Sequence, residues 1–133
     1  MSATEHATEL SRIAARAAAG KSGTDIVALD VSEKLAITDI FLVISAVNER
    51  QVSAVVDAVD EALIKAGTKR TRREGEQENR WVLLDYLDLV VHVQHVEARE
   101  LYSLERLWGD CPRIDLELPA TPDQQADGQE RAE

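Results

Sequence analysis

The chain has few aromatic residues and a single cysteine, and these shortages exclude several classes of protein. One cysteine, Cys111, permits neither an internal disulfide nor a cysteine-based zinc site. No apolar run approaches the roughly 20 residues that a membrane-spanning helix needs. The N-terminal stretch lacks the basic start and the apolar core of a signal peptide. A cytoplasmic location is therefore expected.

Basic charge is scarce too. The chain carries 15 lysines and arginines against 25 acids, which gives a formal net charge of −10. Broad binding to nucleic acid relies on basic side chains that neutralise phosphates, so this balance argues against it. An acidic surface instead favours basic partner proteins, of which ribosomal proteins are the commonest in the cytoplasm. With 44% hydrophobic and 30% charged residues, the composition is that of a folded globular protein.

The acids crowd toward the C-terminus. From Asp115 onward the chain holds six acids and one arginine, and beyond Pro119 it has no apolar periodicity. We therefore predict a single α/β domain over residues 1–112 and an acidic, disordered tail over residues 113–133. At the start of that tail three apolar residues alternate with charge, a pattern compatible with a short edge strand: Ile114, Leu116 and Leu118.

The apolar periodicity predicts three helices and four strands. The helices cover residues 5–21, 48–66 and 97–108, and the strands cover residues 25–31, 39–46, 81–86 and 89–93. The second strand is almost uninterrupted in its apolar character, which is typical of a strand covered on both faces. The last two strands are separated by so few residues that an antiparallel hairpin is expected. This order of elements predicts a small α/β sandwich with a mixed β-sheet flanked by helices.

Three aspartates lie at predicted strand ends, where carboxylates can hold Mg²⁺ for phosphoryl or nucleotidyl transfer: Asp39, Asp85 and Asp88. A nucleotidyltransferase-like enzyme that uses them with a divalent metal is the alternative hypothesis. Aspartate is also a favoured turn residue, because its side chain accepts hydrogen bonds from nearby backbone amides. The glycine-rich loop that would hold a phosphate is missing. The turn interpretation is therefore favoured.

The histidines and serines offer no better candidate for chemistry. His92 and His95 are three residues apart, and on a strand this spacing directs them to opposite faces rather than to one metal. No serine stands in a recognisable nucleophile motif with a histidine. We predict no catalytic residue, no metal ligand and no cofactor.

The polar segment 68–80 is predicted to be an exposed loop that can include a short edge strand. It contains a basic cluster: Lys69, Arg70, Arg72 and Arg73. These side chains could touch RNA phosphates. No aromatic residue is interleaved with them and the rest of the chain is acidic, so a solvated loop is favoured over an RNA site. A minor contact with ribosomal RNA is the alternative.

Both tryptophans and both tyrosines lie between Trp81 and Asp110. In the last predicted helix, an apolar stripe includes Leu107 and Trp108, while Tyr102 lies off it. Trp81 begins a strand and Tyr86 lies beside a turn, and such rims are where amphipathic rings often act as contact anchors. The segment is therefore predicted to be partly core and partly contact surface.

Four motifs between residues 25 and 110 carry a family resemblance. They are ALDVSEKLAITDIFLVISAVNERQVSAVVDAV, Glu74–Gly75, WVLLDYLDLVVHV and LYSLERLWGD. In these motifs the chain resembles the ribosomal silencing factor family (RsfS), whose members include the plant Iojap proteins. One departure is visible, because Leu87 stands where family members often have glycine. A tight turn with positive φ is less comfortable there with leucine.

The resemblance implies a binding protein rather than an enzyme. Family members dock on a protein of the large ribosomal subunit, the fourteenth in its series, at a bridge to the small subunit. They thereby block subunit joining and repress translation when nutrients are scarce. The family's fold is similar to that of nucleotidyltransferases without their active site, and members commonly form homodimers.

On this basis we expect the partner-binding surface to combine aromatic anchors with acids that steer docking onto a basic protein. Its predicted members are Trp81, Tyr86, Asp88, His92, Tyr102, Glu105 and Trp108. The core is predicted to include Leu83, Val91, Leu104 and Leu107. Whether the two tryptophans belong to the core or to the contact surface is left open by the sequence.

Overall fold

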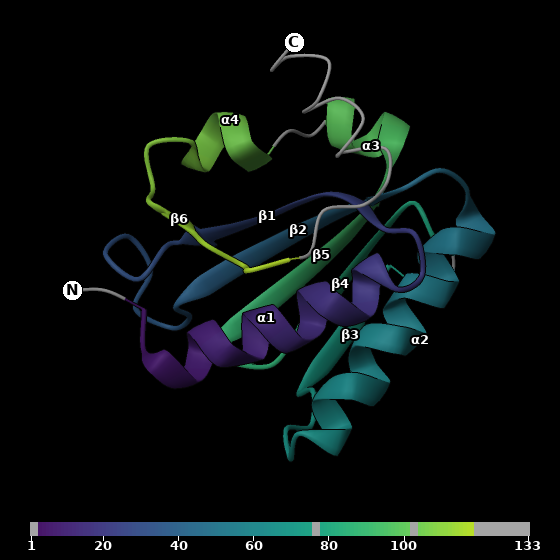
Figure 1. Cartoon of the computed structure of the whole chain (residues 1–133). Coiled ribbons are helices and arrows are strands. Elements are labelled where there is room, and N and C mark those ends of the chain that lie inside the picture. Colours follow the sequence, from purple (N-terminus) through teal and green to yellow (C-terminus); the bar gives the residue numbers. More distant parts are fainter. Residues whose placement is uncertain (1–2, 76–77, 102–103, 119–133) are drawn as a thin grey trace, which may run out of the picture.

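The computed structural model describes residues 3–75, 78–101 and 104–118, without the side chains at positions 100, 101, 105 and 107. Within these ranges a six-stranded sheet has the order β3-β4-β5-β2-β1-β6 (Figure 1). The strands are β1 Thr24–Asp30, β2 Ile40–Ala46, β3 Arg72–Glu74, β4 Trp81–Asp85, β5 Leu89–His95 and β6 Arg113–Ile114. The helices are α1 Glu5–Ala19, α2 Glu49–Lys65, α3 Val96–Leu101 and α4 Leu104–Trp108.

The sheet is mixed, as predicted. Strands β2 and β5 run parallel at its centre, with Leu42 opposite Val91, and all other neighbours are antiparallel. The predicted hairpin is confirmed as β4 and β5, in which Val82 lies opposite Val93. The polar loop contributes the short strand β3 at one edge, and β6 forms the other edge.

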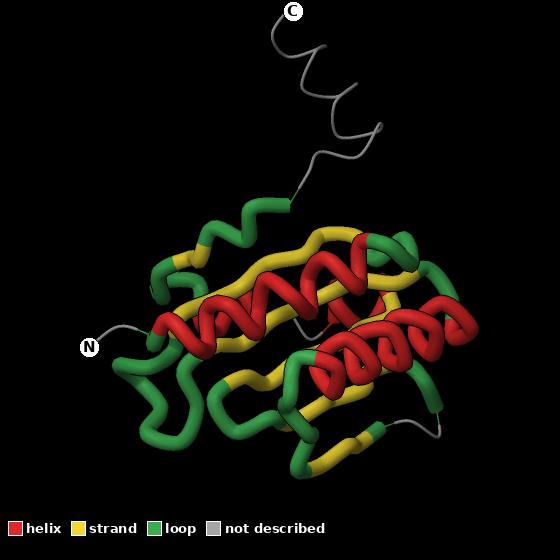
Figure 2. Tube along the Cα trace, turned by 60° about the horizontal axis from the view of Figure 1, so that its bottom comes forward, coloured by secondary structure: helices red, strands yellow, loops and turns green. Residues whose placement is uncertain are grey.

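Helices α1 and α2 lie side by side over one face of the sheet, here called the helix face (Figure 2). Each begins at a capping side chain: Thr4 accepts a hydrogen bond from the Ala7 amide, and Asn48 accepts one from the Gln51 amide. The apolar stripe of α2 is fully buried against the sheet, as the sequence pattern predicts. Its members are Val52, Val55, Val56, Val59 and Leu63.

The opposite face of the sheet is covered only in part. Figure 1 shows α3 and α4 on this side, away from α1 and α2. Trp108 of α4 packs edge-on against Phe41 of β2, with ring centroids 5.4 Å apart, beside the buried side chains of Leu29 and Val31. Arg99 of α3 is buried and donates hydrogen bonds to the Ser45 hydroxyl and to the Asp25 carbonyl. The surface of this side beyond α3 and α4 is here called the open face.

The last predicted helix, residues 97–108, is helical in its described parts, α3 and α4. Residues 102 and 103, between them, lie outside the described residues. Arg99 anchors α3 to the sheet, and Trp108 anchors α4. None of the helices within the described ranges combines the length and the apolarity needed to cross a membrane.

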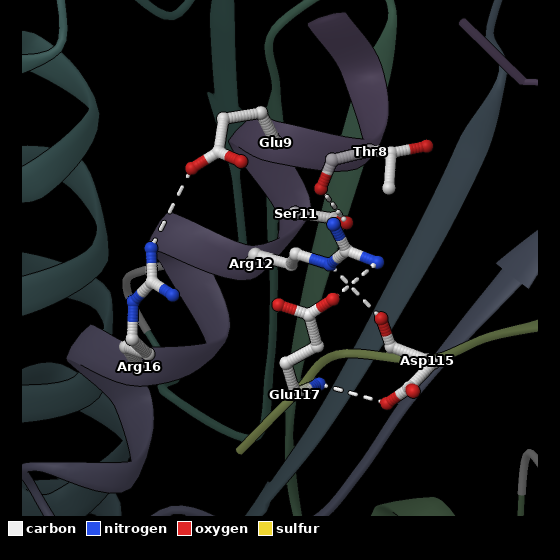
Figure 3. A network of polar contacts seen from close by, with 7 residues as sticks. All are labelled: Thr8, Glu9, Ser11, Arg12, Arg16, Asp115 and Glu117. Atoms are coloured by element: carbon white, nitrogen blue, oxygen red, sulfur yellow. Dashed lines mark hydrogen bonds and ion pairs between the residues drawn. The ribbon is translucent and has the colours of Figure 1, made fainter. Parts of the chain in front are cut away.

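A C-terminal strap, residues 113–118, is tied to the domain. Strand β6 pairs with β1, and Leu116 is buried in the core. Figure 3 shows Arg12 of α1 reaching this strap: its Nε donates to the Asp115 carbonyl at 3.0 Å, and its guanidinium lies 3.2 Å from the Glu117 carboxylate. Packing thus continues past residue 112, where the sequence placed the domain boundary. Residues 119–133 of the predicted tail lie outside the described residues.

Candidate docking surface

The open face presents apolar side chains from three neighbouring strands. Side chains alternate along a strand, so Trp81 and Leu83 of β4 point to the same side of the sheet. Leu83 lies opposite His92 of β5, and Val90 of β5 lies opposite Phe41 of β2. Trp81, Leu83, Val90 and Phe41 are all only half-buried. The sequence assigned Leu83 to the core; the structure corrects this, because Leu83 is only half-buried and lies on the face opposite to α1 and α2.

Two loops extend this surface into an apolar groove of about 220 Å³. The Asp88 carbonyl accepts hydrogen bonds from the Asp39 and Ile40 amides, at 3.0 and 3.2 Å, and these bonds hold the two loops together. Ile37 and Leu87 consequently line the same groove, although their side chains are 82% and 59% exposed. The other lining residues are Leu35, Thr38, Phe41, Arg72, Leu83, Asp85, Val90 and His92.

His92 supports this surface from beneath. Its ring is 5% exposed, and its Nδ1 accepts a hydrogen bond from the Trp81 indole N–H at 3.1 Å. Burial lowers the pKa of His92 to about 4, so the imidazole is neutral near pH 7 and its proton lies on Nε2. The ring also packs edge-on against Phe41, with centroids 5.0 Å apart. His92 was predicted as a contact residue; buried in this way, it positions Trp81 instead.

Tyr86 also departs from its prediction as a rim anchor. It shares the helix face with Val82 and Leu84 and is only 4% exposed. Its hydroxyl donates to the Asp60 carboxylate of α2 at 2.7 Å, and Arg70 donates to the other oxygen of that carboxylate at 2.9 Å. Burial, together with this carboxylate, raises the pKa of the Tyr86 phenol, which therefore stays protonated. Tyr86 is a core residue that fixes the turn after β4.

The Tyr86→Phe variant tests this assignment. Removing the hydroxyl deletes a buried hydrogen bond to a charged group, so the free energy of unfolding should fall by about 2 kcal/mol. Urea unfolding measures the loss. Because the ring does not reach the open face, partner binding by the folded variant should match that of the unchanged protein. Weaker binding with undiminished stability would contradict the core assignment.

The groove is lined by one charged pair, Asp85 and Arg72, and a further acid, Asp88, lies in the adjacent turn. The Asp88 carboxylate is exposed and has no hydrogen-bond or ion-pair partner in the described part of the chain. Asp85 accepts a hydrogen bond from the Leu87 amide at 2.9 Å and lies 3.7 Å from the Arg72 guanidinium. Of the other predicted contact residues, Trp108 is half-buried on Phe41. Tyr102 and the side chain of Glu105 lie outside what the structure describes.

Two of the three aspartates of the alternative hypothesis accept hydrogen bonds from backbone amides. Asp39 accepts a hydrogen bond from the Thr4 amide at 3.0 Å, at the start of α1, and Asp85 accepts one in its own turn. Among the described residues, no group of three or more histidine, cysteine, aspartate or glutamate side chains is arranged to hold a metal ion. The turn interpretation of Asp85 is confirmed, and the alternative enzyme is not favoured.

Most of the basic cluster is already paired with acids. Arg70 contacts Asp60 at 2.9 Å, Arg72 contacts Glu74 at 2.9 Å, and Arg73 lies 3.9 Å from Asp57. Such pairs cancel much of the positive potential that a phosphate would meet. A contact between Lys69–Arg73 and ribosomal RNA stays a prediction, and the pairing makes it a weak one.

The fold and this surface define a small α/β protein that offers a broad apolar face, with the exposed carboxylate of Asp88 in the turn beside it. The chain belongs to the ribosomal silencing factor family, as the sequence motifs predict: the family model described as "Ribosomal silencing factor during starvation" matches residues 4–133. The names of its relatives describe a regulatory role rather than a catalytic one.

Relatives and solved structures agree with this assignment. The chain is 40% identical over 107 residues to the ribosomal silencing factor of Bacillus subtilis, covering 80% of this chain and 91% of that protein. It is 38% identical over 109 residues to the factor of Halalkalibacterium halodurans, covering 82% and 93%. A crystal structure of a protein from Chromobacterium violaceum superposes with a TM-score of 0.74 at 32% identity, covering 86% of this chain and 94% of that one.

Proposed function

We propose that this chain is a ribosome-associated regulator of translation that binds the large ribosomal subunit and blocks joining of the small subunit. Its partner on the subunit is the basic ribosomal protein that is fourteenth in the large-subunit series, at an intersubunit bridge. It acts in the cytoplasm and represses translation when nutrients are scarce. Family membership and the names of the relatives support the regulatory role.

The observation that carries the proposal is the uncovered part of the sheet. Leu83 and Val90 are central to a six-stranded sheet, yet no element of the described chain covers them fully. Burial of such apolar surface favours association, and half-buried aromatic rings such as Trp81 are frequent anchors in interfaces. Asp88 adds charge at the rim, which steers docking toward a basic surface.

Steric exclusion is enough to block subunit joining, and no chemical reaction is required. A folded domain bound at a bridge occupies the space that the small subunit must enter, so the two cannot bind together. No nucleotide, metal or covalent step is needed. Silencing is therefore reversible, and its strength depends on the concentration of the protein relative to its dissociation constant.

The Asp88→Lys variant tests the docking surface. Reversing an unpaired rim charge should weaken binding to purified large subunits about tenfold at low salt, mainly by slowing association. Cosedimentation over a range of protein concentrations measures the affinity. The fold should be unaffected, because the Asp88 carboxylate has no partner within the described chain.

Glu61→Lys is the matched control. Glu61 is an exposed acid on α2, on the helix side of the sheet, and within the described residues its one ion pair is the surface contact with Lys65. Its reversal changes the net charge by the same amount but should leave binding nearly unchanged. Equal losses for both variants would mean that overall charge, not the open face, controls binding.

Added small subunits should fail to join large subunits that carry the protein, and unimpeded joining would contradict the proposed function.

Self-association stays a further proposal. The family resemblance implies a homodimer in the free protein, and the half-buried apolar side chains of the open face offer a surface on which a second copy would pack. Sedimentation velocity of the free protein measures this state directly.

A further inference from the structure

The turn between β4 and β5 holds a leucine in an unfavourable conformation. Leu87 has a φ of +74°, in the left-handed region where a side chain crowds the backbone and where glycine or asparagine is usual. Three hydrogen bonds enforce the conformation. The Asp85 carboxylate accepts from the Leu87 amide, the Leu89 carbonyl from the Tyr86 amide, and the Tyr86 carbonyl from the Asp88 amide.

The fold gains little from this side chain. Leu87 is 59% exposed, so its apolar atoms contribute little to the core and do not compensate for the strained backbone. Strain of this kind is retained at sites where the residue serves a purpose other than stability. The location of the side chain indicates that purpose, because Leu87 lines the apolar groove together with Ile37, whose side chain is 82% exposed.

The loop that carries Ile37 is tied to the turn that carries Leu87. The Asp39 and Ile40 amides both donate to the Asp88 carbonyl, at 3.0 and 3.2 Å. The side chain of Lys34, in the same loop, forms an ion pair with Asp110 at 2.6 Å, which joins the loop to the chain after α4. Two exposed apolar side chains are thus fixed relative to each other before any partner arrives.

We propose that Leu87 and Ile37 grip one apolar side chain of the large-subunit ribosomal protein, and that Leu87 sets the affinity of this contact. The inference rests on the proposed function and specifies the chemistry of its contact. The groove is mostly apolar and its lining includes the charged pair of Asp85 and Arg72, while the Asp88 carboxylate in the adjacent turn is exposed and has no partner within the described chain. It therefore fits an apolar side chain that has a lysine or arginine beside it.

The Leu87→Gly and Leu87→Asn variants separate binding from stability. Both residues accept a positive φ, so the thermal unfolding midpoint should stay the same or rise by about 2 °C. Both remove the apolar wall, so cosedimentation with purified large subunits should show binding about tenfold weaker. Leu87→Met keeps an apolar side chain of similar volume and should bind like the unchanged protein.

Ile64→Ala is the control for a loss of exposed apolar surface. Ile64 is 51% exposed on α2, away from the groove, and its replacement should leave binding unchanged. Unchanged binding of Leu87→Gly, or a loss equalled by Ile64→Ala, would overturn the inference. A lower unfolding midpoint for Leu87→Gly would also overturn it, because the side chain would then serve the fold. If Leu87→Gly changed only the self-association of the protein, the inference would also be overturned, because the groove would then bind a second copy of this chain.

The two proposals fail in different ways. If the unchanged protein does not sediment with large subunits, the proposed function fails and this inference falls with it. If the unchanged protein sediments and Leu87→Gly sediments equally well, only the role of Leu87 is refuted.

Discussion

Replacing Gly75 by alanine is expected to lower the free energy of unfolding by about 3 kcal/mol, through backbone strain and a steric clash together. Gly75 follows β3 with a φ of +86°. A Cβ atom there would lie 2.0 Å from the Trp81 carbonyl oxygen, a backbone atom that moves only if β4 moves. The end of β3 must therefore move away from β4 at Trp81. Urea unfolding measures the loss.

Gly67→Ala is the matched control for this change. Gly67, which follows α2, has a φ of +91°, but nothing lies within 4 Å of a Cβ atom built there. Its replacement adds backbone strain alone and should cost about 1 kcal/mol. The loss of unfolding free energy in Gly75→Ala beyond that in Gly67→Ala measures the effect of the close approach of β3 to Trp81. Equal losses for the two variants would show that this approach does not constrain the fold.

The elements of the fold were predictable because local sequence signals determine them. Asn48 caps α2 through the Gln51 amide, and the Gln51 side chain in turn accepts from the Val47 amide at 2.6 Å. The hairpin of β4 and β5 follows from two apolar runs with Asp85 at the turn between them. The mixed order of the sheet follows from a helix placed between the first and second pairs of strands. None of these features requires knowledge of distant contacts.

Assignment of residues to the core and to the rim was less successful, and the reason is physical. Alternation along β4 places Trp81 with Leu83 on one face and Tyr86 with Val82 on the other. Both faces are apolar, so the pattern alone does not reveal which one the helices cover. The sequence interpretation placed Leu83 in the core and Tyr86 on the rim, whereas the covered face is the one that carries Tyr86.

The groove itself was missed because distant residues form it. Ile37 and Leu87 lie in different loops, and the Asp88 carbonyl joins those loops through the Asp39 and Ile40 amides. The one local signal was Leu87, in a turn where the family resemblance leads us to expect glycine. The sequence identified the strain that this substitution implies, but not the apolar groove that the leucine completes.

Lowering the pH from 7.5 to about 5 is expected to remove about 2 kcal/mol from the free energy of unfolding through His92 alone. Burial lowers the pKa of His92 to about 4 in the folded chain, below the value of about 6.5 expected after unfolding. The unfolded chain therefore binds the proton first. The contribution of His92 is complete above pH 6.5 or so and is lost progressively as the pH falls toward 4.

Protonation of the folded chain also reaches the open face, because it places a proton on the Nδ1 atom that accepts the Trp81 indole N–H at 3.1 Å. Two donors then face each other, so Trp81 must move, and binding to large subunits should weaken as the pH approaches 4, where the folded chain itself takes up the proton. His92→Gln is the control: its amide oxygen can accept from Trp81, and it does not titrate. Urea unfolding of both proteins at each pH isolates the histidine from the carboxylates. If their stabilities fall in parallel, the neutral His92 ring is not what makes this surface sensitive to acid.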